Sequence, residues 1–489
     1  MPNFYVENFG CRAAQADGAA IEQQFRNRGL ERAEAPAQAG IVVLNTCTVT
    51  AAADQDARAA VRRIRRQNPG CQIVVTGCYA QRSPEELAVL EGVSAVIGNS
   101  HKHRLVDLFL AGGIRKEVEP SFVPISSLLP EQKEAPGKSQ RLTANGQRPI
   151  FVSDIFAHTE LQAAPVFDAA NERTRPNLKV QDGCDNRCSF CVIPSVRGQS
   201  RSLSLDEILR QVNILVEAGY RELVISGINL GRWGRDLPMR GSTSGQRLPA
   251  NEQRLETLVR AILSETMLQK LRISSVEPMD WCDGLIALMA ASPRIAKHAH
   301  VPMQSGSDAV LRRMHRKYRP WHYREKIEKI RAAMPTAAIG ADVMTGFPGE
   351  TDAEFEETRR MVEELPFTYL HVFTYSPRPG TPAAAMKNQV PAHIARERNR
   401  ILRELAEEKK RAFMHSFVGK TIEAITLNAS DGAVVEALTD NYLKLRLSGN
   451  HEPNRWIAAE VVSVEDGVLI GECRSASPLQ LAAQATGMS

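Results

Sequence analysis

Apolar and polar residues alternate along the first hundred residues in the order that a parallel α/β sheet requires. Apolar runs at 3–10, 40–46 and 72–77 are each followed by a stretch with helical periodicity, and a shorter apolar run lies at 94–98. Strands that alternate with helices in this way pack as a parallel sheet. The pattern therefore predicts an N-terminal open parallel α/β domain over residues 1–115.

The alternation stops after this domain and resumes on a larger scale. Residues 116–174 are rich in Pro, Gln, Ser and Gly without a sustained period, which predicts a linker. Six strand–helix units in residues 175–405 predict a partial (β/α)6 barrel, whose reactive groups sit at the carboxyl ends of its strands. A charged helix that ends in 406–416 then leads to short alternating runs over 417–477, which predict a small all-β barrel.

The composition of the chain indicates a folded protein of several domains. A chain of 489 residues suggests about two to four domains, and its hydrophobic and charged fractions, 43% and 24%, are ordinary for folded proteins. No run of about 18 apolar residues occurs and the N-terminus lacks a signal-peptide pattern, so we expect a cytoplasmic protein without a membrane partner. Thiols stay reduced in that compartment, so the nine cysteines indicate metal or redox chemistry.

The charge of the chain is unevenly distributed. Residues 417–477 hold five Lys or Arg against nine Asp or Glu, so this segment is acidic while the rest of the chain is basic. A basic body attracts a polyanion such as a nucleic acid, whereas an acidic barrel suits a basic protein partner better. Charge alone leaves both classes of partner open.

Three cysteines lie close together directly after a predicted strand. Cys184, Cys188 and Cys191 have the spacing C-x3-C-x2-C, which binds three irons of a [4Fe–4S] cluster and leaves the fourth iron without a protein ligand. Zinc is the alternative metal, but structural zinc sites usually use two C-x2-C pairs and this chain has no second one. A set of inert thiols is the remaining alternative.

A second set of cysteines follows one rule of position. Cys11, Cys47 and Cys78 each come at the carboxyl end of a predicted parallel strand, and such strand ends share one crevice of an open sheet. We therefore expect them to converge on a second cluster with an open iron, the alternative being three unrelated small residues. Cys71 begins its strand instead of ending it, and we interpret it as an ordinary thiol, like Cys282 and Cys473.

The two cysteine triads, in this order and with a trailing β domain, resemble the methylthiotransferase family of radical S-adenosylmethionine (SAM) enzymes over nearly the whole chain. The resemblance implies two [4Fe–4S] clusters and SAM as cofactors, with the six cysteines as catalytic metal ligands. SAM would chelate the open iron at Cys184, Cys188 and Cys191 and be cleaved to a 5′-deoxyadenosyl radical, while the first cluster carries sulfur. The trailing module is similar to the family's RNA-binding TRAM domain.

Short signatures resemble one branch of that family. "NTCTVT" at 45–50, "KVQDGC" at 179–184 and "ISSVEP" at 273–278 are similar to the branch that methylthiolates C2 of N6-threonylcarbamoyladenosine (t6A) at position 37 of tRNA. "CRAAQADG" departs from it, because that branch commonly has Asn before the Gln. The alternatives are the branches acting on isopentenyladenosine or on a ribosomal protein, and a non-catalytic iron–sulfur RNA-binding protein. The implied partners are the tRNA anticodon stem-loop and a reduced electron donor such as flavodoxin or ferredoxin.

Residues at the expected barrel rim are candidates for contacts with the cofactor and the substrate. The candidate SAM contacts are Phe190, Gly227, Gly231, Gln304, Gly306, Asp342 and Gly346. The candidate substrate contacts are Glu277, Arg197, Arg201, Arg316 and Arg378. The alternatives are ordinary ones: a core Phe, glycines that end strands, a turn at Glu277 and solvated arginines.

Overall fold

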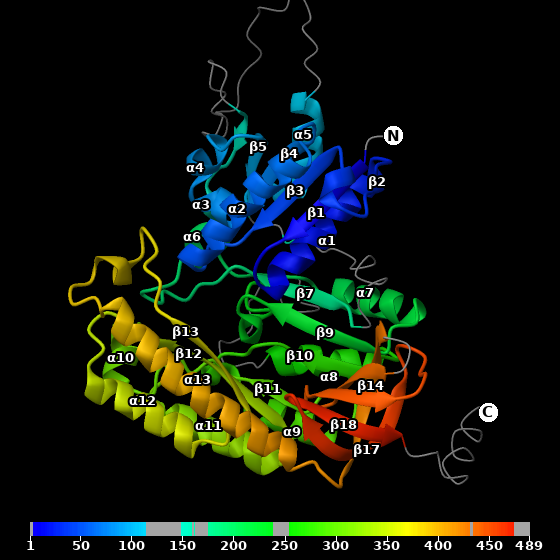
Figure 1. Ribbon diagram of the computed structural model, residues 1–489, viewed down its shortest axis with the longest axis vertical. Helices are drawn as coiled ribbons and strands as arrows, with labels where there is room; N and C mark the ends of the chain where they lie inside the picture. Colours follow the sequence, from blue (N-terminus) through cyan, green and yellow to red (C-terminus); the bar gives the residue numbers. More distant parts are fainter. Residues whose placement is uncertain are drawn as a thin grey trace, which may run out of the picture.

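The computed structural model consists of two α/β units and a small β barrel (Figure 1). The N-terminal sheet lies above the second unit, and the C-terminal barrel lies beside the lower strands of that unit. No helix in the described part of the chain is long and apolar enough to cross a membrane. The structure describes residues 3–113, 148–158, 161, 175–237, 254–430 and 434–473.

The N-terminal unit is a parallel sheet with strand order β2-β1-β3-β4-β5-β6. Its central strand, β3, is buried along its whole length because helices cover both faces of the sheet. Its strands are β1 (Asn3–Asn8), β2 (Glu31–Arg32), β3 (Ile41–Thr46), β4 (Gln72–Gly77), β5 (Val93–Gly98) and β6 (Ile150–Phe151). Its helices are α1 (Arg12–Asn27), α2 (Ala51–Gln67), α3 (Cys78–Arg82), α4 (Pro84–Ala88) and α5 (Leu105–Gly113).

Local sequence explains where these elements begin. In residues 116–174, however, the sequence pattern did not reveal a strand and a short helix. The Thr50 side chain accepts a hydrogen bond from the Ala53 amide, which caps the start of α2. Strand β6 and a short 3-10 helix at Ile155–Ala157 come from within 116–174, so the linker prediction does not hold for this part. A two-residue edge strand is too short to show a period. Residues 114–147, 159–160 and 162–174 lie outside the described residues.

The second unit is the predicted partial (β/α)6 barrel, with six parallel strands. They are β7 (Asn177–Asp182), β9 (Glu222–Gly227), β10 (Lys270–Ile273), β11 (His298–His300), β12 (Ala338–Thr345) and β13 (Tyr369–Thr374). A short antiparallel strand, β8 (Arg201–Ser202), flanks β7, and an isolated bridge between Leu271 and Ile295 connects the two halves. This class of fold is confirmed.

Helices surround the outside of this half barrel and pack on one apolar core. They are α7 (Leu205–Glu217), α8 (Arg254–Glu265), α9 (Asp283–Ala291), α10 (Asp308–Arg313), α11 (Pro320–Ala333), α12 (Asp352–Glu364) and α13 (Ala392–His415). The short helix α6 (Ile193–Arg197) lies instead at the contact with the N-terminal unit, where it packs on α3. Helix α13 is continuous, so the boundary expected between 405 and 406 falls inside one helix. In β12, Ile339, Ala341 and Val343 belong to the helix-covered core, which turns Asp342 toward the interior of the half barrel.

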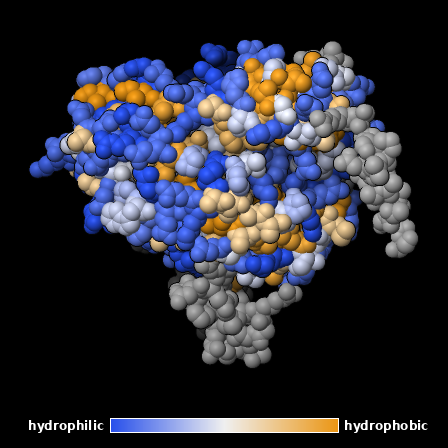
Figure 2. All heavy atoms as spheres, turned by 90° about the horizontal axis from the view of Figure 1, so that it is seen from below, coloured by the Kyte–Doolittle hydropathy of each residue, from blue (hydrophilic) through white to orange (hydrophobic). Residues whose placement is uncertain are grey.

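The C-terminal unit is a closed barrel with strand order β14-β15-β16-β18-β17, as predicted. Its strands are β14 (Thr421–Ser430), β15 (Val434–Thr439), β16 (Lys444–Ser448), β17 (Trp456–Glu465) and β18 (Val468–Cys473). The turn between β15 and β16 docks on the half barrel, where Asp440 pairs with Lys270 at 3.1 Å and Asn441 donates to the Thr336 carbonyl at 3.0 Å. On the face in Figure 2, apolar side chains form separate patches in a largely hydrophilic surface.

Candidate active site

The N-terminal sheet places Cys11, Cys47 and Cys78 at one edge. Strands β1, β3 and β4 are neighbours and parallel, and each is followed within three residues by one of these cysteines. Cys11 precedes the first turn of α1, and Cys78 begins α3. The three thiols therefore meet because three adjacent strands end side by side.

Contacts around Cys47 show how close this triad is. A Cβ atom on Gly10 would lie 2.7 Å from Cβ and 2.9 Å from Sγ of Cys47, so the backbone before Cys11 touches the second cysteine. Burial raises the pKa of the Cys47 thiol to about 11, and the neighbouring Cys78 and Cys11 contribute to the rise. Cys71, at the opposite end of β4, is buried in the core beneath α2.

The second triad occupies the loop between β7 and α6. The Cys191 amide donates to the Cys188 carbonyl at 3.1 Å, which makes a turn between these two cysteines. Burial, followed by the proximity of Cys188 and Cys184, raises the pKa of Cys191 to about 12. Partly buried thiols held this close suit a metal that takes them as thiolates.

Nitrogen donors next to the sulfur atoms fit an iron–sulfur cluster at each triad. Asn99 donates to Cys78 Sγ at 3.5 Å, Asn229 to Cys184 Sγ at 3.5 Å, and Arg316 to Cys188 Sγ at 3.3 Å. Hydrogen bonds to thiolate ligands tune the reduction potential of such clusters. All nine cysteines lie in the described residues and are free.

The two triads lie close together across a domain contact. Helix α3, which begins with Cys78, packs on α6, and Cys78 belongs to one apolar cluster with Val192 and Val196. Asn99 joins both sides, because its amide also donates to the Val196 carbonyl at 2.8 Å. The fold thus brings two cysteine sites together from segments more than a hundred residues apart.

An ion-pair network fixes the contact between the domains. Arg197 pairs with Asp182 at 2.9 Å and with Asp17 of α1 at 3.0 Å, and both carboxylates also pair with Lys179. Lys102 pairs with Asp17 at 2.9 Å. Burial alone would raise the pKa of Asp17, but the surrounding cations hold it well below its usual value. We call these five residues the Asp17 network.

Arg197 and Arg201 were expected as contacts to the substrate, and the structure buries both side chains. Arg197 is held by the carboxylates of the Asp17 network, and Arg201 donates to the backbone carbonyls of His158 and Arg197 at 3.0 and 2.9 Å. The structure therefore gives these residues a part in the domain contact, and a contact with the substrate stays a prediction.

The other substrate candidates also have partners inside the protein. Arg316 pairs with Glu277, which is partly exposed, and contacts Cys188, so both lie beside the second triad. Arg378 is buried and donates to Thr48 Oγ1 at 3.0 Å and to Asp54. It links the end of the half barrel to the loop that follows Cys47. A direct contact of these residues with a substrate stays a prediction.

Four buried side-chain oxygens at the carboxyl ends of strands β9, β10 and β11 lack a hydrogen-bond partner in the described part of the chain. They are Ser226 Oγ, Asn229 Oδ1, Ser274 Oγ and Gln304 Oε1. Buried polar atoms are normally paired, and the Asn229 side chain also donates to Cys184 Sγ of the second triad, so these unpaired oxygens fit a polar cofactor such as SAM. Gln304 was expected here, whereas the two serines and Asn229 were not singled out, although they lie in or beside the motifs "ISGINLG" and "ISSVEP".

The remaining SAM candidates form two groups. Phe190 meets the edge of Phe347 with ring centroids 6.4 Å apart, beside the second triad. The four glycines lie in close contacts between barrel elements: a Cβ on Gly306 would lie 2.7 Å from Thr358 Cα, and one on Gly231 would lie 2.4 Å from Asp280 Cβ. Gly227 and Gly346 are similarly crowded, by Gln181 and by Ala395. These contacts account for glycine by packing, and contacts with SAM stay predictions.

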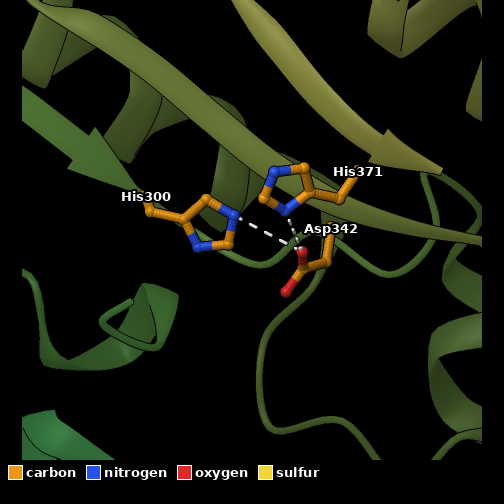
Figure 3. A group of neighbouring side chains, drawn as sticks. All are labelled: His300, Asp342 and His371. Carbon is orange, nitrogen blue, oxygen red and sulfur yellow. Dashed lines mark hydrogen bonds and ion pairs between the residues drawn. The ribbon is translucent and has the colours of Figure 1, made fainter. Parts of the chain in front are cut away.

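Asp342 lies between two histidines inside the half barrel (Figure 3). His300 of β11 and His371 of β13 reach the same carboxylate oxygen, at 3.4 and 3.3 Å. Burial opposes ionisation of Asp342, but its contacts with both rings, a hydrogen bond with His371 and an ion pair with His300, hold its pKa well below the usual value. Neither histidine was expected, because the residues converge only when three strands are paired.

Comparison with known proteins places this site in a family. Residues 3–98 match the model described as "Uncharacterized protein family UPF0004", and residues 178–362 match the radical SAM superfamily. The threonylcarbamoyladenosine tRNA methylthiotransferase MtaB of Bacillus subtilis is 34% identical over 92% of both chains. The enzyme of the same name from Aquifex aeolicus is 33% identical over 92% of this chain and 98% of its own. This chain belongs to the radical SAM methylthiotransferase family.

Two further comparisons concern an enzyme with a different tRNA substrate and a solved structure. The tRNA-2-methylthio-N(6)-dimethylallyladenosine synthase of Thermobifida fusca is 30% identical over 96% of this chain and 84% of its own. The solved radical SAM methyltransferase TsrM of Kitasatospora setae shares the fold with a TM-score of 0.52 at 14% identity, over 78% of this chain and 74% of its own. The predicted family is therefore confirmed. The chain is a radical SAM transferase, as that family implies.

Proposed function

We propose that this methylthiotransferase installs a methylthio group at C2 of t6A at position 37 of tRNA. The observation that carries the proposal is the pair of cysteine triads that α3 and α6 bring together, because one site for a radical and one for sulfur are both needed. The choice of t6A is supported by the two MtaB enzymes, which are 34% and 33% identical to this chain over nearly their whole length. The anticodon stem-loop is then the macromolecular substrate, and a reduced protein such as flavodoxin or ferredoxin the electron donor.

Each triad would hold one [4Fe–4S] cluster, Cys11, Cys47 and Cys78 the first and Cys184, Cys188 and Cys191 the second. When bound, the second cluster and SAM supply a 5′-deoxyadenosyl radical, and the first cluster supplies sulfur. Arg316 and Asn229 stabilise the thiolates of the second triad by donating to their sulfur atoms. Asn99 does the same for Cys78.

Other side chains position the cofactor and keep the site closed. Gln304 and Asn229 offer buried oxygens that would accept from the amino or ribose groups of SAM, and Phe190 would lie along its adenine. The Arg378 contact with Asp54 and the Asp17 network hold the N-terminal domain over the half barrel. Cys47 and Cys78 are buried and the second triad is partly buried, which limits the access of water to a reactive radical, whereas Cys11 is exposed.

Nucleoside analysis tests the proposed substrate. In a bacterial strain that lacks its own enzyme, expression of this chain is expected to convert t6A to its 2-methylthio derivative in digested tRNA, measured by mass spectrometry. Isopentenyladenosine should stay unmodified in the same digest. If the methylthio group appears on isopentenyladenosine or on a ribosomal protein instead, the enzyme belongs to a sister branch.

Iron counting tests the two clusters. Anaerobic reconstitution is expected to give about eight irons per chain, four for each cluster. Replacing Cys11, Cys47 and Cys78 together with alanine should leave about four, because the second triad is on a separate loop. The matched control is Cys71→Ala on the same sheet, which should keep about eight. A count of about four in the unmodified protein would contradict the proposal of two clusters.

A further inference from the structure

The interior of the half barrel contains a group of cations that neither cysteine triad uses. Arg12, Arg175 and Arg272 surround the ring of Tyr442, with guanidinium carbons 6.0, 5.8 and 5.1 Å from its centroid. We call these four residues the Tyr442 cluster. Arg12 begins α1, the next two belong to the half barrel, and Tyr442 comes from the turn between β15 and β16. Three domains thus meet at one ring.

The position of Tyr442 is enforced by its surroundings. Its φ of 69° lies in the left-handed region, which is unfavourable for a tyrosine. The turn is held nonetheless, because Arg272 donates to the carbonyls of Thr439 and Asp440 at 3.4 and 3.2 Å. Arg12 donates to the Tyr442 hydroxyl at 3.0 Å. A strained residue held in this way indicates a function inside the half barrel.

The Tyr442 cluster has more positive than negative charge. Among the described residues, Glu222 is the one carboxylate within 4.0 Å of its guanidinium groups, at 2.7 Å from Arg272 and 3.9 Å from Arg175. Arg12 has no ion-pair partner in the described part of the chain. Burial lowers the pKa of Arg175, and repulsion from Arg272 and Arg12 adds to this effect. Such a surplus of positive charge is relieved when an anion binds.

A ligand can reach this cluster along the interior of the sheet. The side chain of His371 on β13 is 66% exposed, although Figure 3 shows it facing Asp342 inside the half barrel. Tyr442 is itself 36% exposed. A row of rings leads inward, with centroids 5.0 Å apart from Tyr442 to His298 and 5.8 Å from His298 to Tyr369. Flat rings of this kind accept a stacked base.

We propose that Arg12, supported by Arg175, binds the carboxylate of the N6 substituent on the substrate adenosine. The inference rests on the proposed function, since t6A has a free carboxylate on its threonyl group and isopentenyladenosine has none. A guanidinium binds a carboxylate through two parallel hydrogen bonds, which fixes orientation as well as charge. Arg12 follows Cys11 directly, so the segment that holds the first cluster also orients the base. The cluster selects the acidic nucleoside over the neutral one.

SAM also has a carboxylate, so the experiment must separate the two sources. Three anticodon stem-loops serve as substrates, with t6A, the methyl ester of t6A, or isopentenyladenosine at position 37. The unmodified enzyme is expected to prefer t6A to its ester by about 10- to 100-fold in kcat/KM, as a charged hydrogen bond provides. Arg12→Gln should lower the t6A value by that factor and the ester value little, which removes the preference. Arg12→Lys should recover part of it.

Controls make the outcome specific. Arg396→Gln, on the exposed side of α13, should keep the preference for t6A, and the iron content of Arg12→Gln should equal that of the unmodified enzyme. Equal use of t6A and its ester by the unmodified enzyme, or an equal loss with both in Arg12→Gln, would overturn the inference. So would a raised KM for SAM, which would assign Arg12 to the SAM carboxylate. Activity on isopentenyladenosine alone would defeat the proposed function itself.

Discussion

Replacing Cys47 with alanine is expected to abolish the methylthio product while SAM is still cleaved to 5′-deoxyadenosine. The reason is the separation of the triads: Cys47 follows β3 of the N-terminal sheet, whereas Cys184, Cys188 and Cys191 occupy one loop of the half barrel. Loss of one of three thiolates disrupts the first site, and the second keeps all of its ligands. This variant should therefore still form the radical but no longer transfer sulfur.

Both products are measured in one anaerobic assay with dithionite as the reductant and a t6A stem-loop as the substrate. Cys191→Ala is expected to lose 5′-deoxyadenosine and the methylthio product together. Cys71→Ala provides the matched control and should keep both products, because Cys71 lies directly before β4, at the end of the strand opposite Cys78. An equal loss of 5′-deoxyadenosine in Cys47→Ala and Cys191→Ala would show that the two triads do not act separately.

The sequence predicted those features of this site that depend on a rule of position. Cys11, Cys47 and Cys78 follow neighbouring parallel strands, so their convergence required the strand order and no side-chain detail. The six barrel strands were predicted from their sequence pattern, because long alternating runs of apolar and polar residues have a clear period. Strand β6 was missed because two residues carry no period.

Partners that lie far apart in sequence escaped prediction. Arg197 was expected to contact the substrate, and its carboxylate partner Asp17, which lies 180 residues away in another domain, was not foreseen. Tyr442 meets Arg12 across 430 residues, and no local pattern connects them. Basic residues in a loop look alike in sequence whether they are solvated or buried. A buried basic residue differs from a solvated one in having a tertiary partner, and that partner is in place only when the domains have assembled.

The buried position of Arg197 leads to the second large effect. Arg197→Met keeps most of the length of the side chain and removes its charge, which leaves Asp17 and Asp182 with less compensation inside the domain contact. Removing one partner of a buried ion pair typically costs about 3 to 5 kcal/mol, because the charges left behind stay desolvated. Lys102 and Lys179 remain beside Asp17, so we expect a loss of stability near the lower end of that range.

Thermal unfolding of the cluster-loaded enzyme measures this effect. We expect Arg197→Met to lower the Tm by about 10 °C, the shift that such a loss produces in a domain of this size. Arg197→Lys should recover part of the loss, and Arg62→Met on the exposed side of α2 should leave the Tm unchanged. Hydrogen exchange should rise in α1 and α6, where the network joins the domains. If Arg197→Met instead keeps its Tm and weakens binding of the tRNA stem-loop, Arg197 contacts the substrate as the sequence first indicated.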